Sequence, residues 1–167
     1  MTPILTANAV DFVSHSTEQT QRLGERLGNL LESGDVVCLE GALGAGKTCL
    51  TQGIGRGLGV RARITSPTFI IVHEHPVPHR AFKLYHIDLY RIETSAEACA
   101  TGLEEYFYGD GVCVIEWAER VVDILPQHRL WITMRYVDPT KRGLVFEAHG
   151  ERYADLVRRF AQEAFGV

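Results

Sequence analysis

Cysteine is scarce in the sequence, and no two cysteines are closely spaced. The four are Cys38, Cys49, Cys99 and Cys113, and none of them form a C-x-x-C pair. Structural zinc sites are commonly built from such pairs, so their absence argues against a zinc protein. Cys38 and Cys113 lie within apolar runs. We expect them to be small core residues of a chain with reduced thiols.

The chain also lacks an excess of positive charge and a long apolar segment. Its 167 residues include 17 Lys and Arg against 21 Asp and Glu, a formal net charge of −4. The overall charge therefore does not indicate nucleic-acid binding. The first residues, MTPILTANAVDF, contain neither a basic stretch nor a long apolar one. We expect no signal peptide, no membrane span and a cytoplasmic protein.

Length and hydrophobic patterning predict a single α/β domain over residues 1–167. Apolar runs predict buried parallel strands at 36–40 and 112–117, and a short strand at 9–14. Two hairpins are predicted, from strands at 69–75 and 81–90, and from strands within 125–137 and 144–150. Helices are predicted from Ser16 or Thr17 to Ser33-Gly34, over 46–59, within 93–108 and over 151–165, with an exposed loop at 60–68.

The glycine-rich stretch GALGAGKT, residues 41–48, fits the pattern G-x-x-x-x-G-K-[ST] at every fixed position. Glycines let backbone N–H groups turn toward a polyphosphate, Lys47 reaches the β and γ phosphates, and the Thr48 hydroxyl binds Mg²⁺. The alternative is a chance glycine turn, but a buried strand is predicted before it and a helix after it. The predicted phosphate-binding residues are Gly41, Leu43, Gly44, Ala45, Gly46, Lys47 and Thr48.

Two carboxylates follow apolar strands and are candidate catalytic and metal-binding groups. Glu116 ends the run VCVIE, and Asp88 ends the run KLYHID. Ligands of open α/β sheets collect at the carboxyl ends of the strands, so Glu116 would lie near Thr48 and hold Mg²⁺ with it. Asp88 would orient or deprotonate the attacking water, with Lys47 and Glu116 as the other catalytic residues. The alternative for Asp88 is a structural pair with Arg91.

Asparagine is rare, which bears on the choice of nucleotide. Only Asn8 and Asn29 occur, and neither precedes a lysine, so the guanine-reading N-K-x-D motif is missing. We therefore expect ATP rather than GTP. A small-molecule P-loop kinase is an alternative, with a basic lid drawn from Arg56, Arg61 and Arg63. These residues and Arg91 are also a candidate contact surface for tRNA or for an acidic partner.

Four further motifs resemble those of a known family. GALGAGKT is followed in order by SPTF (66–69), YHIDLYR (85–91), VIEW (114–117) and LP (125–126). In this order and spacing they resemble the TsaE (YjeE) family, over about residues 14–150. The resemblance implies a P-loop NTPase-like three-layer domain with a central, mostly parallel sheet and flanking antiparallel hairpins. It also implies a small bacterial ATPase that acts with TsaB and TsaD in making threonylcarbamoyladenosine (t6A) in tRNA.

The resemblance implies further site residues. Ser66 and Thr68 match a loop that would sense the γ-phosphate, although a plain turn before a strand would explain SPTF as well. Trp117 follows the metal-side glutamate as in the family. Thr17 and Arg142 match positions near the nucleotide more loosely. Two departures are Ala42, where many members are acidic, and Cys49 after Thr48 in place of a second threonine.

Together these observations predict an Mg²⁺-dependent ATPase, weak alone and stimulated by TsaB and TsaD. It would serve t6A modification as an ATP-driven switch and not as the transferase, with tRNA contacted weakly or indirectly and no membrane involved. Two alternatives remain open at this point. One is the small-molecule kinase, and the other is a nucleotide-sensing binding module without useful turnover.

Overall fold

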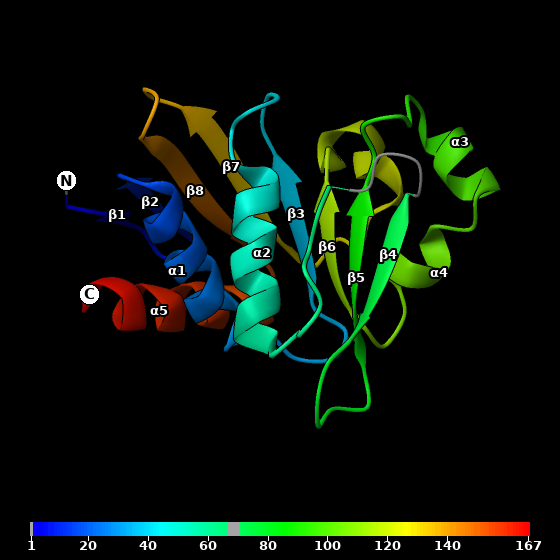
Figure 1. Cartoon of the computed structure of the whole chain (residues 1–167), viewed down its shortest axis with the longest axis horizontal. Coiled ribbons are helices and arrows are strands. Elements are labelled where there is room, and N and C mark those ends of the chain that lie inside the picture. The colour runs from blue at the N-terminus through cyan, green and yellow to red at the C-terminus, as the bar shows by residue number, and fades with distance from the viewer. Residues whose placement is uncertain (1, 67–70) are drawn as a thin grey trace.

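A computed structural model describes residues 2–66 and 71–167 of the chain (Figure 1). Thr68 of the predicted sensing loop and the start of the strand predicted at 69–75 lie outside the described residues. In chain order the elements are β1 (Ile4–Leu5), β2 (Ala9–Ser14), α1 (Thr17–Gly28), β3 (Val36–Glu40), α2 (Lys47–Leu58), β4 (Val72–Pro76), β5 (Lys83–Asp88), α3 (Ser95–Ala100), α4 (Glu104–Phe107), β6 (Val112–Glu116), the short 3₁₀ helix η1 (Ala118–Ile124), β7 (Arg129–Tyr136), β8 (Arg142–His149) and α5 (Glu151–Phe165).

The strands form a mixed sheet with a parallel centre. Within the described residues it has eight strands in the order β1-β2-β8-β7-β3-β6-β5-β4. The neighbours β7, β3, β6 and β5 run parallel, whereas the pairs β4–β5, β7–β8, β2–β8 and β1–β2 are antiparallel. This confirms the predicted parallel centre and both flanking hairpins. The parallel strands end at one edge, where the loop between β3 and α2 also lies (Figure 1).

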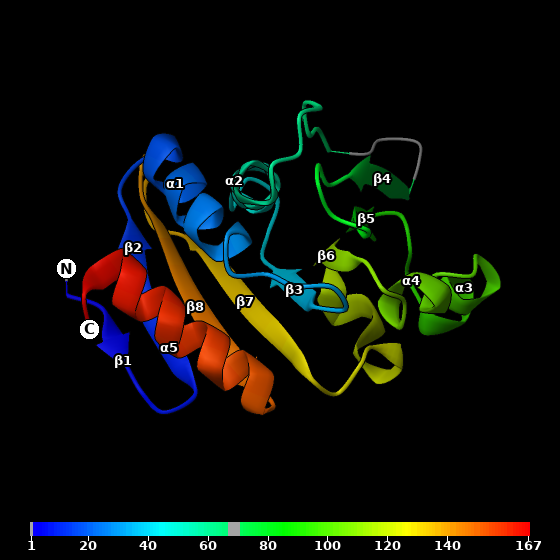
Figure 2. The same cartoon turned by 90° about the horizontal axis from the view of Figure 1, so that it is seen from below.

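Helices cover both faces of the sheet and give the predicted three layers. Val37 and Leu39 of β3 point into one core, which includes buried side chains of α1, α2 and α5. Val36 and Cys38 point the other way, into a core with α3, α4 and η1. The alternation follows from the two-residue period of a strand. Figure 2 shows α1 and α2 side by side over the sheet.

Several boundaries differ from those predicted. Helix α1 ends at Gly28 and not at Ser33-Gly34. Leu30 and Leu31 are buried, but their N–H groups bond to the carbonyls of Leu27 and Gly28 in a turn, at 2.9 and 3.3 Å. Their apolar spacing therefore reflects the core and not a helix. The loop predicted as exposed from residue 60 contains a buried residue, Ile64, with 4% of its surface exposed. β1 and η1 were not predicted.

The contact between α1 and α2 explains the glycines within α2. A Cβ atom built on Gly53 would lie 2.2 Å from the backbone oxygen of Gln21, and one on Gly57 would lie 2.2 Å from that of Glu25. From the other helix, a Cβ on Gly28 would lie 2.3 Å from the oxygen of Ile54. The two backbones touch, so these positions exclude a side chain. The poor helix propensity of glycine is offset by close packing.

We predict that Gly53→Ala destabilises the protein, although alanine is the better helix former. The added methyl group meets the rigid backbone of Gln21, and overpacking costs about 1–3 kcal/mol. The matched control is Gly55→Ala in the same helix, whose methyl group meets side chains and no backbone, the nearest atom being Cδ1 of Ile64 at 2.1 Å. Rotation about the terminal bond of Ile64 can move Cδ1 while the Ile64 backbone stays in place. Urea unfolding should show the larger loss for Gly53→Ala, and an equal or smaller loss would contradict this account.

Candidate nucleotide-binding site

The loop between β3 and α2 has the backbone shape of a phosphate-binding loop. Gly44 has φ 78° and Gly46 has φ 101°, values that L side chains rarely adopt. A Cβ atom on Gly44 would meet nothing within 4 Å, so this side of the loop is open to a ligand. Gly46 caps the N-terminus of α2, where the helix dipole and free N–H groups favour an anion.

Lys47, the first residue of α2, is folded back onto the loop. Its Nζ donates hydrogen bonds to the carbonyls of Gly41, at 2.5 Å, and Ala42, at 3.0 Å. Only 5% of the residue is exposed. Burial lowers the pKa of Lys47, and the nearby Glu116 carboxylate acts in the opposite direction. The ammonium group therefore lies within the loop, where a phosphate could replace the two carbonyls as its hydrogen-bond acceptor.

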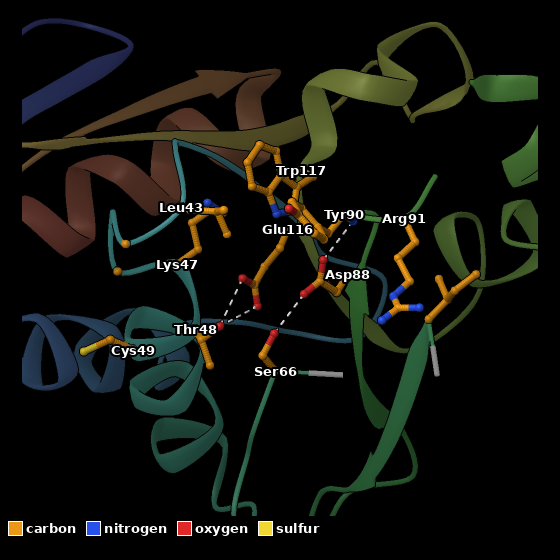
Figure 3. A pocket seen from close by; sticks show the side chains of 13 residues that line it. Leu43, Lys47, Thr48, Cys49, Ser66, Asp88, Tyr90, Arg91, Glu116 and Trp117 are labelled. Atoms are coloured by element: carbon orange, nitrogen blue, oxygen red, sulfur yellow. Dashed lines mark hydrogen bonds between the residues drawn. The ribbon is translucent and has the colours of Figure 1, made fainter. Parts of the chain in front are cut away.

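Glu116 ends β6 and receives hydrogen bonds from two other elements. The Thr48 hydroxyl donates to its two carboxylate oxygens, at 3.2 and 3.3 Å (Figure 3). Nε2 of His86 on β5 lies 2.5 Å from Oε2 of the same carboxylate. His86 is fully buried and Glu116 is 3% exposed. The carboxylate is therefore oriented from both sides, as expected of a group with a fixed task.

Asp88 ends β5 directly beside Glu116, because the two residues are register partners in the parallel pair β5–β6. Its carboxylate accepts hydrogen bonds from the Ser66 hydroxyl, at 3.0 Å, and from the backbone N–H of Tyr90, at 2.9 Å. Burial raises the pKa of Asp88, although the Tyr90 N–H opposes this. Figure 3 shows the side chains of Asp88 and Glu116 entering the same cavity.

Trp117 follows Glu116 in a left-handed backbone conformation, with φ 62°. A bulky residue rarely adopts this conformation, and such strain is often found at functional sites. The left-handed conformation of Trp117 places its indole ring over Lys47, whose Nζ lies 4.2 Å from the ring centroid. Tyr90 packs against the same indole at 5.3 Å between centroids. Trp117 is half-buried, so it is a wall of the cavity and not ordinary core.

A cavity of about 380 Å³ brings together most of the predicted site residues. Those that line it are Leu43, Gly44, Gly46, Lys47, Thr48, Ser66, Asp88, Glu116 and Trp117. Thr17 and Arg142 line a separate, smaller cavity of about 50 Å³, with Gly46 between the two. Gly41 and Ala45 line neither: Gly41 holds Lys47 through its carbonyl, and Ala45 is 1% exposed within the loop turn.

Sequence reasoning did not assign several residues of this site. Cys49, Ile71 and Tyr90 line the main cavity. Arg91 lines it too, although it was considered only as a partner of Asp88 and as part of a basic contact surface. His86 touches Glu116 from the neighbouring strand. The spacing His86-x-Asp88 places both side chains on one face of a strand, which was an available signal. The contact itself depends on the register between β5 and β6.

The described residues offer few ligands for a metal by themselves. No group of three or more His, Cys, Asp or Glu side chains in that part of the chain is arranged to hold an ion. Mg²⁺ in nucleotide sites usually needs only one or two protein oxygens, because phosphates and water supply the others. The oxygens of Thr48 and Glu116, side by side at the start of α2, fit that requirement.

The fold and the loop are those of a P-loop nucleotide-binding protein. A model of the family described as threonylcarbamoyl adenosine biosynthesis protein TsaE matches residues 14–144. A TsaE from Treponema pallidum is 47% identical over 132 residues, covering 79% of this chain and 96% of that protein. A TsaE from Bacillus subtilis is 40% identical over 145 residues, covering 87% and 89%. The chain therefore belongs to the TsaE family and takes part in tRNA t6A biosynthesis.

A solved structure agrees with this assignment. The crystal structure of Bacillus subtilis YdiB superposes with a TM-score of 0.76 at 35% identity, covering 93% of this chain and 95% of that one. The family resemblance and the fold class predicted from the motifs are thus confirmed. Among the described residues, no helix is both long and apolar enough to cross a membrane.

We predict that Asp88→Asn stabilises the nucleotide-free protein at neutral pH. Because burial raises the pKa of Asp88, folding favours the protonated carboxyl, and the ionised form reduces stability at pH 7. Asparagine avoids this penalty: its Oδ1 can accept from the Tyr90 N–H, and its Nδ2 can donate to the Ser66 hydroxyl, which also serves as an acceptor. Thermal unfolding should give a higher Tm for Asp88→Asn at pH 7.

The difference in Tm should shrink as the pH falls toward the ordinary pKa of aspartate, because the wild-type carboxyl is then also neutral. Glu147→Gln, an exposed carboxylate on β8, is the matched control and should change Tm little at either pH. An Asp88→Asn protein less stable than the wild type at pH 7 would show that the carboxylate is structural.

Proposed function

We propose that this chain is an Mg²⁺-dependent ATPase of t6A biosynthesis. It hydrolyses ATP slowly alone and faster with TsaB and TsaD, and it drives a conformational cycle without modifying tRNA itself. The observation that carries the proposal is the pairing of Thr48 with Glu116 at the head of α2, 3.2 Å apart. A hydroxyl and a buried carboxylate at that place are the protein ligands that a P-loop site offers to Mg²⁺.

The nucleotide would lie along the loop, with its phosphates against the N-terminus of α2. Lys47 would exchange its contacts with the Gly41 and Ala42 carbonyls for contacts with the β and γ phosphates. Thr48 and Glu116 would hold Mg²⁺, which when bound neutralises charge on those phosphates. Gly44, Leu43 and Trp117 would complete the wall around the γ-phosphate.

The nucleoside would lie on the side of Thr17 and Arg142. Both residues line the small cavity that adjoins Gly46, whereas Asp88 lines only the main cavity. Arg142 is already oriented toward the loop, because its Nε donates to the Gly44 carbonyl at 3.2 Å. This arrangement supports the roles near the nucleotide that the family resemblance implies for Thr17 and Arg142.

Asp88 would act on the attacking water. The carboxylate lines the cavity in which the γ-phosphate would lie, and its raised pKa makes it a better proton acceptor than an exposed aspartate. Ser66 donates to Oδ2 of Asp88 and so controls where the carboxylate points. A partner that repositions the segment around Ser66 would therefore change the rate of hydrolysis.

A small-molecule kinase remains the second candidate, because the main cavity extends past the P-loop to Tyr90 and Arg91. That space could receive an acceptor instead of water. A phosphorylated small-molecule product, detected by mass spectrometry in an acceptor screen, would favour this alternative.

The first test is ATP hydrolysis with Mg²⁺ by the chain alone and with TsaB and TsaD from the same organism. Asp88→Asn should lower the stimulated rate by about 10²–10⁴-fold while leaving ATP binding intact, as expected for a group that handles a proton. Glu116→Gln should lose both Mg²⁺-dependent binding and hydrolysis. The matched control, Glu147→Gln, should behave as the wild type.

Two results would contradict the proposal. If TsaB and TsaD leave the wild-type rate unchanged, the partner-stimulated switch is wrong. If Asp88→Asn keeps full partner function in t6A synthesis while Lys47→Ala abolishes it, the chain senses the nucleotide and does not need turnover.

A separate prediction concerns His86, which we propose positions Glu116 for Mg²⁺. His86→Leu removes the contact at Nε2 and should raise the Mg²⁺ concentration needed for binding of a fluorescent ATP analogue by about 10–100-fold. Binding in EDTA should not change. His86→Gln, which can still donate an N–H group, should restore most of the Mg²⁺ response. His149→Leu, at the end of β8, is the control, and an unchanged Mg²⁺ response in a folded His86→Leu protein would refute the role.

A further inference from the structure

A second concavity lies away from the P-loop, between α2 and the segment that follows it. Its volume is about 420 Å³. Arg56 from α2 and Arg61 and Arg63 from the following segment contribute three exposed guanidinium groups to its lining. We call this concavity the arginine groove. It shares no lining residue with the nucleotide cavity.

The charge of the arginine groove is opposite to that of the whole chain. The chain has a formal net charge of −4, yet the groove gathers three cations. Arg56 has one carboxylate near it, Glu25 at 4.0 Å, in an exposed pair of little strength. Within the described residues, the side chains of Arg61 and Arg63 have no hydrogen bond or ion pair. Their guanidinium groups are therefore available to an anionic partner.

The floor of the groove is anchored, unlike its rim. Ile64 is 4% exposed and fills the space left by the missing side chain of Gly55. Its carbonyl accepts a hydrogen bond from Nε2 of Gln52 on α2, at 2.9 Å. The Oε1 atom of Gln52 accepts in turn from Nε2 of Gln21 on α1, at 3.0 Å. The segment is thus tied to both helices at one point.

The same segment reaches the candidate catalytic carboxylate. Ser66 comes two residues after Ile64, and its hydroxyl donates to Oδ2 of Asp88 at 3.0 Å. Arg63 and Ser66 are separated by only two residues, of which Ile64 is the fixed point. A ligand that binds Arg61 and Arg63 would therefore shift a short backbone segment, and this shift would change the position of Ser66 and its hydrogen bond to Asp88.

We propose that the arginine groove is the docking site for an acidic segment of a partner protein, and that docking there sets the contact between Ser66 and Asp88. The inference rests on the proposed function, to which it adds a place where partner binding is coupled to hydrolysis. The planar fork of arginine matches a carboxylate through two parallel hydrogen bonds. Charge complementarity of this kind gives specificity and fast association.

The composition of the groove favours protein over RNA as the partner. Single-stranded nucleic acid is usually held by aromatic side chains that stack on its bases, as well as by cations. None of the described residues that line the groove is aromatic. Three cations on a chain of net negative charge also form a small footprint for a phosphate backbone.

The test compares Arg61→Glu/Arg63→Glu with Arg22→Glu/Arg159→Glu, two exposed arginines outside the groove. Hydrolysis is measured alone and with TsaB and TsaD, and the affinity for these partners is measured by titration. The groove variant should hydrolyse ATP alone at the wild-type rate and lose the stimulation. Its affinity for the partners should fall about tenfold or more, because two attractions become repulsions. The control variant should match the wild type in all three measurements.

Each contrary result has its own meaning. If the partners neither bind nor stimulate the wild type, the proposed function fails, whatever the groove does. If the wild type is stimulated and the groove variant is stimulated equally, the groove is not the docking site. If the groove variant loses its unstimulated activity, the arginines belong to the nucleotide site and the inference is overturned.

A second measurement identifies the chemistry of the ligand. Fluorescent deca-glutamate and a ten-nucleotide oligouridylate of the same label are titrated against the wild type and both variants. Deca-glutamate should bind the wild type and the control variant and be lost in the groove variant. Tighter binding of the oligouridylate through the same arginines would make the groove a nucleic-acid site and overturn the proposal.

Discussion

A buried carboxylate needs hydrogen-bond donors, and the site is arranged around the way Glu116 obtains them. With 3% of its surface exposed, Glu116 accepts from Thr48 on α2 and contacts His86 on β5. These contacts require β3, β6 and β5 to run parallel and in register, so that the P-loop and both carboxylates meet at one edge of the sheet. A slip of one residue in either pairing would turn Glu116 to the opposite face.

Much of this geometry could be predicted because it follows from local rules. The strand before the loop, the helix that begins at Lys47 and the carboxylates at the strand ends all follow from apolar runs and glycine spacing. The unpredicted features depend on contacts between distant segments. The His86–Glu116 contact depends on the β5–β6 register. The presence of a glycine at position 53, inside a helix, is explained only by the backbone of α1 that packs against it. The early end of α1 was not predicted for a related reason: Leu30 is buried in the core from a turn after the helix, so its apolar side chain does not indicate a longer helix.

Burial disfavours the ionised forms of Lys47 and Asp88, and this makes the nucleotide-free protein less stable. Burial lowers the pKa of Lys47 and raises that of Asp88, so in both cases the ionised form is disfavoured. An incoming polyphosphate with Mg²⁺ would give Lys47 an anionic partner. The strained backbone of Trp117 adds to the same arrangement, because it places an aromatic wall over the ammonium group. These features lower the stability of the nucleotide-free protein and at the same time preorganise the site for a highly charged ligand.

The position of Ser66 offers a physical reason why such a site would be slow by itself. Glu116 is held by groups on a helix and a strand, whereas one of the two hydrogen-bond donors to Asp88 comes from a loop. Precise orientation of a catalytic group depends on the rigidity of what supports it. Under the proposed function, slow hydrolysis by the isolated chain would follow if the alignment of Asp88, and not metal or phosphate binding, limits the rate. In the proposed docking, a partner that binds Arg61 and Arg63 would fix the position of Ser66, and through it the Asp88 carboxylate, without contributing a group to the site.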